Sequence, residues 1–145
     1  MISNKLFAIL FVAVILNLLQ FIYSGFTKIP KFNTKVETLQ KKTGNLLQGN
    51  FGTLLAKAGM AGVILLEIVG SFTLIYGVYL LRTDPGLINS PMFKKLVILT
   101  LILFMAFIVV ATVIYHPPGE KKMIPFMSNV STLGGFGFLL YIFLM

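Results

Sequence analysis

Long apolar runs separated by shorter polar segments form the main pattern of this sequence. Four runs stand out, at residues 6–27, 54–81, 96–115 and 124–145. Each is close to the ~20 residues that an α-helix needs to cross a hydrocarbon layer of about 30 Å. The pattern therefore predicts an all-α membrane protein, a bundle of four transmembrane helices.

The polar segments between the runs predict how the helices are connected. The first is the longest, and its residues 34–42 are expected to form a short helix at the membrane interface. The second carries an Asp-Pro-Gly turn signal at 84–86, so we expect a short ordered loop. In the third, two prolines follow His116 and should end the preceding helix there.

The whole chain, residues 1–145, is predicted to form a single transmembrane domain. Its first apolar run lacks a small-residue cleavage site, so we interpret it as a helix rather than a secretory signal. With four spans, both termini lie on one side of the membrane. Lys and Arg are more numerous in the first and third connections, so the positive-inside rule places these connections in the cytoplasm.

The composition fits a protein surrounded by lipid. Of 145 residues, 57% are hydrophobic and 11% charged, whereas soluble domains carry roughly a quarter charged residues. The net charge of +8 comes from Lys and Arg between the apolar runs, where it orients the protein and contacts anionic lipid. We expect a multi-pass integral protein in contact with the bilayer, with no nucleic-acid partner; the identity of the membrane stays open.

One acid lies midway through the second apolar run. Glu67 is the only ionisable residue so deep in such a run, and a comparable acid there costs about 2.5–3.5 kcal/mol on insertion scales. It must be neutralised, either by protonation or by a cation with hydrogen-bond donors. Two interpretations stay open: Glu67 stabilises the bundle through polar contacts, or it accepts protons or orients a ligand.

A polar stripe on the first helix offers partners for this acid. Asn17, Gln20, Ser24 and Lys28 recur every three or four residues, so they share one helix face, which we expect to point into the bundle. The opposite face is expected to meet lipid, and its residues are Leu18, Leu19, Ile22 and Phe26.

Two more polar residues are candidates for a site. His116, the only histidine, either caps the third helix or faces a pocket at the membrane boundary and exchanges protons. Asn129 either bonds across helices or contacts a lipid headgroup or a quinone. Close helix packing is predicted at small residues of the second and fourth runs, namely Gly59, Gly62, Gly70, Gly77, Gly134 and Gly135.

The sequence offers no catalytic or metal-binding arrangement. There is no cysteine, and the single histidine has no nearby nucleophile motif. Haem coordination within one chain would need a second histidine or an opposed ligand, which the sequence does not supply. We expect no metal, no covalently bound cofactor and no catalytic residue; a non-catalytic role is favoured over an enzymatic one.

Four features occur in an order and spacing known from one family. They are Tyr-Ser-Gly-Phe-Thr-Lys at 23–28, Glu-Ile-Val-Gly at 67–70, His116, and Asn-Val-Ser-Thr-Leu-Gly-Gly at 129–135. On these features the chain resembles the DoxX family of small four-helix membrane proteins over nearly its whole length. The family usually carries an arginine early in the first helix, where this chain has Lys5.

The resemblance implies an accessory subunit of a membrane redox complex. Some family members act with quinone-linked oxidoreductases, many have no assigned activity, and related four-helix proteins are cargo receptors. If this chain is such a redox subunit, Glu67 and His116 would accept protons or hydrogen-bond a quinone, with Lys28 and Asn129 beside them. A partner's cofactor would then supply the chemistry. Two alternatives stay open: a structural or assembly protein of an envelope or larger complex, with other subunits or itself as partner, and a small-solute transporter, for which four helices make a poor pathway.

Overall fold

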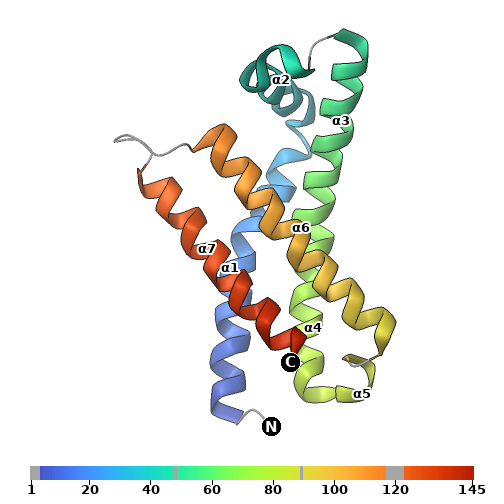
Figure 1. Cartoon of the computed structure of the whole chain (residues 1–145), viewed down its shortest axis with the longest axis vertical. Helices are drawn as coiled ribbons and strands as arrows, with labels where there is room; N and C mark the ends of the chain where they lie inside the picture. The colour runs from blue at the N-terminus through green and yellow to red at the C-terminus, as the bar shows by residue number, and fades with distance from the viewer. Residues whose placement is uncertain (1–3, 48, 89, 117–122) are drawn as a thin grey trace.

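Four long helices make up most of the molecule (Figure 1). The structure is a computed structural model, and it describes residues 4–47, 49–88, 90–116 and 123–145. Over these residues, four helices are long and apolar enough to span a membrane. They are α1 (Asn4–Lys28), the continuous helix Gly49–Thr83, α6 (Pro91–Tyr115) and α7 (Met123–Leu144). The predicted fold class and the multi-pass integral character are confirmed.

A short helix covers one end of the bundle. The helix α2 (Phe32–Thr43) confirms the predicted helix near residues 34–42, and the 3₁₀ turn η1 (Gly44–Leu47) leads from it into the second span. Val36 of α2 is buried against Ala56 and Met60 of α3 (Gly49–Leu65). This apolar contact fixes α2 at the end opposite both chain termini (Figure 1).

The third span begins earlier than predicted. We expected residue 96, but α6 starts at Pro91, because proline suits the first helical position and the Ser90 hydroxyl accepts a hydrogen bond from the Phe93 N–H at 3.4 Å. The preceding connection is short, as expected, but it contains a helical turn, α5 (Pro85–Ile88). The end of α6 at Tyr115 agrees with the prediction, whereas residues 117–122 lie outside the described part of the chain.

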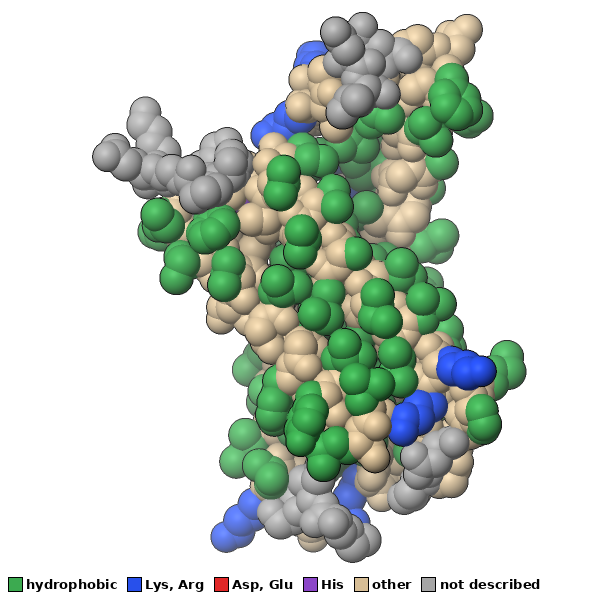
Figure 2. Space-filling view, in the orientation of Figure 1, with side chains coloured by type: hydrophobic (Ala, Val, Ile, Leu, Met, Phe, Trp, Pro, Cys, Tyr) green, Lys and Arg blue, Asp and Glu red, His purple; other side chains and the backbone are tan. Residues whose placement is uncertain are grey.

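Apolar side chains both fill the core and cover the outside of the bundle. Figure 2 shows hydrophobic side chains over the middle of one face and Lys and Arg toward the ends. Inside, the rings of Phe21, Phe104 and Phe136 form a cluster with centroids 5.2–5.8 Å apart. The prediction that Leu18 faces lipid is wrong: its side chain is fully buried, because the core-facing stripe of α1 runs directly beside the polar stripe.

A wide turn interrupts the second span at its midpoint. Residues Leu66–Gly70 form a π-helical turn, η2, between α3 and α4 (Ser71–Thr83). Such a turn holds an extra residue and shifts the phase of the helix. The Ser71 hydroxyl donates a hydrogen bond of 2.6 Å to the Glu67 carbonyl, so this backbone oxygen has a partner.

This phase shift changes which glycines face a neighbour. Gly70 and Gly77 are buried against α6, where an added Cβ would come within 2.9 Å of Phe104 and 3.0 Å of Val97. The predicted packing is not found at Gly59, Gly62 or Gly134, because a Cβ added at these positions would meet open space among the described residues. A Cβ added at Gly135 would lie 3.4 Å from the Asn17 amide nitrogen, an ordinary contact distance. Within the second span, the predicted packing at glycines is thus found after the start of the π turn and not before it.

The first two spans approach each other closely at a glycine that the sequence pattern did not single out. A Cβ at Gly25 would lie 2.6 Å from Cγ1 of Ile68 and 3.2 Å from Cβ of Glu67. Both contacts are on or near the backbone of η2, where side chains have little freedom to move. Gly25 thus lets α1 pass directly over the π turn.

Replacing Gly25 by alanine should destabilise the bundle. We expect Gly25→Ala to lower the free energy of unfolding by about 1–3 kcal/mol, because the added methyl overpacks the contact with Ile68. Reversible unfolding in detergent, followed by circular dichroism, measures this. Gly62→Ala is the matched control, since its added methyl meets open space and should change stability by no more than about 1 kcal/mol. Equal effects of the two variants would contradict the tight contact.

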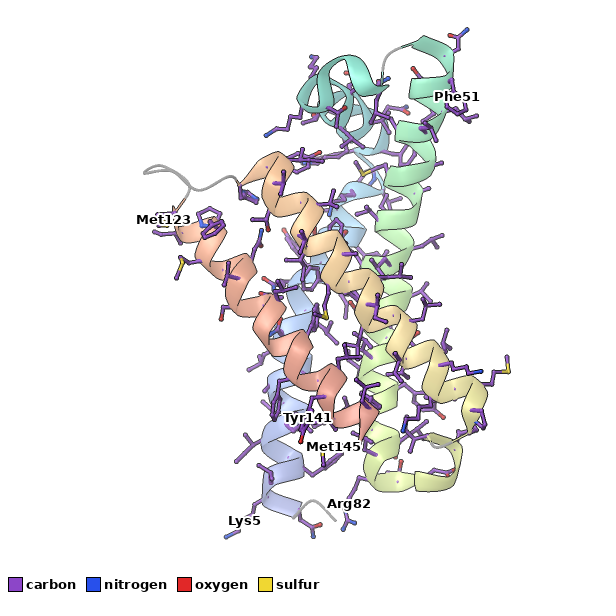
Figure 3. The ribbon with its side chains drawn as sticks, in the orientation of Figure 1. Lys5, Phe51, Arg82, Met123, Tyr141 and Met145 are labelled. Carbon is purple, nitrogen blue, oxygen red and sulfur yellow. The ribbon has the colours of Figure 1, made fainter. Side chains whose placement is uncertain are left out.

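The two ends of the molecule carry the charges that orient it. Lys5 and Arg82 lie at the end that holds Met145 (Figure 3), and Arg82 donates a hydrogen bond of 2.6 Å to the Asn4 side chain. The other end holds the lysines of α2, including Lys41 and Lys42. The two termini therefore share one side, opposite α2.

Cysteine labelling should place α2 in the cytoplasm. The chain has no cysteine, so Lys41→Cys and Lys95→Cys each give one thiol, at opposite ends of the bundle. Because the α2 end follows the basic connections, we expect a membrane-impermeant maleimide added to intact cells to label Lys95→Cys alone. Labelling of Lys41→Cys alone would reverse the orientation.

Candidate functional site

An ion pair lies inside the bundle, at the middle of the second span. The ammonium nitrogen of Lys28 is 2.6 Å from both carboxylate oxygens of Glu67, and the two side chains are 17% and 2% exposed. Ser24 donates a further hydrogen bond of 3.2 Å to Oε1 of Glu67, and Lys28 donates one of 2.5 Å to the Ser24 hydroxyl. The buried acid is therefore paired with a cation rather than left alone in an apolar environment.

Three features of the sequence bring this pair together. Ser24 and Lys28 are four residues apart, so both face η2 from the last turns of α1. Gly25 lies between them and permits the close approach of the two helices. Lys28 is the last residue of α1, and its long aliphatic stem lets the charge reach inward from the helix end.

A cavity of about 510 Å³ lies beside the ion pair. Helices α1, α2, α3, α6 and α7 and the turn η2 all contribute to its wall. Its polar lining includes all four residues that the sequence pointed to as ligand or proton sites: Lys28, Glu67, His116 and Asn129. Much of the remaining wall is apolar, with residues such as Met60, Val63, Phe107, Ile108, Ala111 and Ile114.

The end of α6 holds two of these polar groups in place. The Asn129 amide donates a hydrogen bond of 2.9 Å to the Thr112 hydroxyl, which in turn donates to the Ile108 carbonyl at 2.6 Å. His116 ends the helix, with its backbone N–H bonded to the Thr112 carbonyl at 2.9 Å. The helix-capping position and the pocket position predicted for His116 are thus compatible. Its role, and that of Asn129, stay predictions.

The short helix α2 adds residues that sequence reasoning missed. Lys35, Thr38 and Leu39 line the cavity from one face of α2, and Lys42 lies 4.6 Å from the ring centroid of Tyr115, a cation–π contact. Their spacing of three and four residues is visible in the sequence. Only the placement of α2 over the bundle reveals that this face looks into a cavity.

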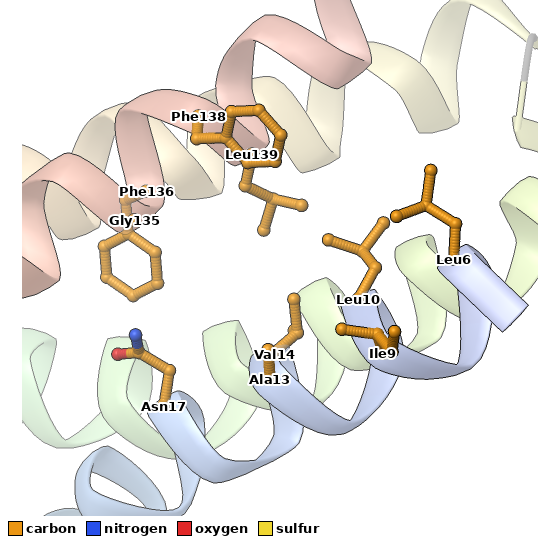
Figure 4. Close-up of a pocket in the computed structure, with 10 residues that line it drawn as sticks. All are labelled: Leu6, Ile9, Leu10, Ala13, Val14, Asn17, Gly135, Phe136, Phe138 and Leu139. Carbon is orange, nitrogen blue, oxygen red and sulfur yellow. The ribbon is translucent and has the colours of Figure 1, made fainter. Parts of the chain in front are cut away.

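The polar stripe of α1 does not act as one unit. Its upper part, Ser24 and Lys28, binds Glu67, and Gln20 lines the same cavity although it is exposed. Asn17 points toward α7 instead, beside Gly135 (Figure 4). Its Oδ1 atom is buried and has no hydrogen-bond partner within the part of the chain that the structure describes.

The described residues contain no cluster of His, Asp or Glu side chains. Within the described ranges, no three His, Asp or Glu side chains lie close enough to hold an ion. The cavity instead combines a neutralised ion pair, the positive charge of Lys35 and several hydrogen-bonding groups with apolar walls. Such a lining suits an amphiphilic molecule that has a polar head and an apolar body.

The comparison with known proteins gives no relative for this chain: no family model, no curated protein and no solved structure matches it. The likeness to the DoxX family therefore stays a prediction. The structure itself establishes a multi-pass helical membrane protein.

Loss of the carboxylate should weaken the bundle. We expect Glu67→Gln to lower the free energy of unfolding in detergent by about 2–3 kcal/mol, because Lys28 would keep a partly buried charge without its counterion. The double variant Lys28→Met/Glu67→Leu should recover most of this loss, since it removes both charges.

The matched control for this prediction is Glu37→Gln, which removes an exposed carboxylate of α2 and should leave stability nearly unchanged. If Glu67→Gln and Glu37→Gln unfold alike, the ion pair is not needed for the fold.

Proposed function

We propose that this protein is a quinone-interacting accessory subunit of a membrane redox complex, without a catalytic centre of its own. One observation carries the proposal: a single cavity among apolar helices is lined by Lys28, Glu67, His116 and Asn129. The resemblance to the DoxX family points to the same class of function. Quinones are soluble in the bilayer, so a cavity between transmembrane helices is within their reach.

The chemistry of a quinone head matches the groups in the cavity. Its two carbonyl oxygens accept hydrogen bonds, and Asn129 has a second amide hydrogen besides the one bonded to Thr112. Gln20 and His116 supply further polar groups on the lining. The ring would lie against apolar and aromatic wall residues such as Phe21 and Phe107.

Lys28 has a different task in this proposal. Its ammonium group has three hydrogens, and contacts to Oε1 and Oε2 of Glu67 and to Ser24 account for all of them. Lys28 therefore holds the carboxylate in position rather than binding the ligand. Oxidation of a quinol releases two electrons and two protons; in this proposal a cofactor of the partner subunit would take up the electrons, and Glu67 and His116, which line the cavity, would accept the protons.

A second candidate function is the assembly of a larger membrane complex. The observation that favours it is the same ion pair, because all the hydrogens of the Lys28 ammonium are bonded inside the chain. A pair satisfied in this way can serve the stability of the bundle alone. The partner would then be another membrane subunit or a second copy of the chain.

Quinone binding should depend on Asn129. We expect the protein, purified with native lipid, to release quinone on extraction, and to bind added quinone saturably in lipid nanodiscs. Asn129→Leu should weaken this binding about tenfold, since it removes a donor and fills part of the cavity. Equilibrium binding of a radiolabelled quinone measures the change.

Ser131→Leu is the matched control, because Ser131 is exposed two residues further along α7 and does not line the cavity. It should bind quinone as the unmodified protein does. Absence of quinone from the native extract together with no saturable binding would remove the quinone proposal. Crosslinking in the membrane that recovers partner subunits would then support the assembly function.

A further inference from the structure

One side of α1 lines three spaces in the bundle and changes character along its length. It is polar from Lys28 down to Asn17 and apolar from Ala13 down to Leu6. The facing side of α7 runs in the opposite direction, from Asn129 through Gly135 to Met145. These residues of α1 and α7 define a seam with a polar end, which other helices also line, and an apolar end.

Three hollows lie in sequence along this seam. Below the polar cavity is a hollow of about 280 Å³ beside Asn17 and Gly135 (Figure 4), and below that is one of about 420 Å³ between Leu10 and Ile142. The two lower hollows share three lining residues, Leu6, Leu10 and Phe138, so they adjoin each other. Their walls are apolar, except for the amide of Asn17 at the upper end.

A contact between two aromatic rings lies between the polar cavity and the hollow below it. Phe21 lines the polar cavity, Phe136 lines the upper of the two apolar hollows, and their ring centroids are 5.8 Å apart. The polar cavity and the upper apolar hollow therefore meet at this ring contact.

We propose that this seam is the binding groove for the long hydrocarbon tail of a polyprenyl quinone. The inference rests on the proposed function and extends it: the head occupies the cavity beside Glu67, and the tail follows α1 past Asn17 toward Leu6. From Asn17 to Leu6 the groove is about 16 Å long at the rise of an α-helix. The ligand class is therefore a long-chain quinone rather than a short, water-soluble one.

The dimensions of the groove favour a flexible chain over a protein helix. A further transmembrane helix would need its axis about 8–10 Å from the axes of its neighbours. The hollows of about 280 and 420 Å³ lie between α1 and α7, with Leu81 at the edge of the larger one, and leave room only for a narrower chain. Gly135 keeps the passage open where it faces Asn17, because any longer side chain there would point into the upper hollow. The polar-to-apolar change along the seam also matches one molecule with a head and a tail.

The position of the tail can be tested by photo-crosslinking. The probe is a quinone whose polyprenyl tail carries a diazirine at its far end, added to the full-length protein in nanodiscs. After irradiation, mass spectrometry of peptides should find adducts on the lower halves of α1 and α7. Gly135→Leu should lose most of these adducts while it still binds a quinone that has a single isoprene unit, because only the tail path is filled.

Gly134→Leu is the matched control, since Gly134 has open space and does not line the hollows; its adducts should equal those of the unmodified protein. Adducts spread over the lipid-facing surfaces of the helices, or adducts unchanged by Gly135→Leu, would overturn the proposal that the tail binds in this groove. In that case, binding of the short quinone would still leave the proposed function intact. The groove proposal would also be overturned if a diazirine fatty acid labels the groove and the quinone does not displace it. Failure of the short quinone to bind would overturn both the groove proposal and the proposed function.

Discussion

The burial of one carboxylate among apolar helices is the constraint on which the rest of this structure depends. An acid at such depth needs a cation and hydrogen-bond donors, and the last turns of α1 supply both through Lys28 and Ser24. This pairing fixes α1 against η2, and Gly25 makes the approach possible. Polar contacts, rather than the hydrophobic effect, hold this pair of helices in register, because lipid is as apolar as their side chains.

The ion pair also shapes the cavity beside it. Since the carboxylate and the ammonium neutralise each other, the polar end of the cavity carries hydrogen-bonding groups and the charge of Lys35 without an isolated buried charge. The same helices supply apolar walls directly next to these groups. Such a lining is complementary to molecules that are themselves divided into a polar head and an apolar body.

The sequence predicted the helices better than the contacts between them. Apolar runs revealed all four spans, and the cost of burying Glu67 pointed to the stripe that contains its partners. The start of α6 was misplaced because the run of apolar residues begins after its capping signal at Ser90 and Pro91. The packing glycines were only partly identified, since helical periodicity assumes a regular turn and cannot foresee η2.

The π turn has a consequence for how this chain can be aligned with any related sequence. The extra residue of the π turn rotates the side chains of α3 about the helix axis relative to those of α4. Glu67 and Gly70 therefore keep their neighbours only while that residue is present. A homologue with an uninterrupted α-helix here would be one residue shorter between its acid and its second packing glycine. A position-by-position alignment across residues 66–70 would then pair side chains that occupy different faces, and a gap inside a transmembrane helix would be the correct solution.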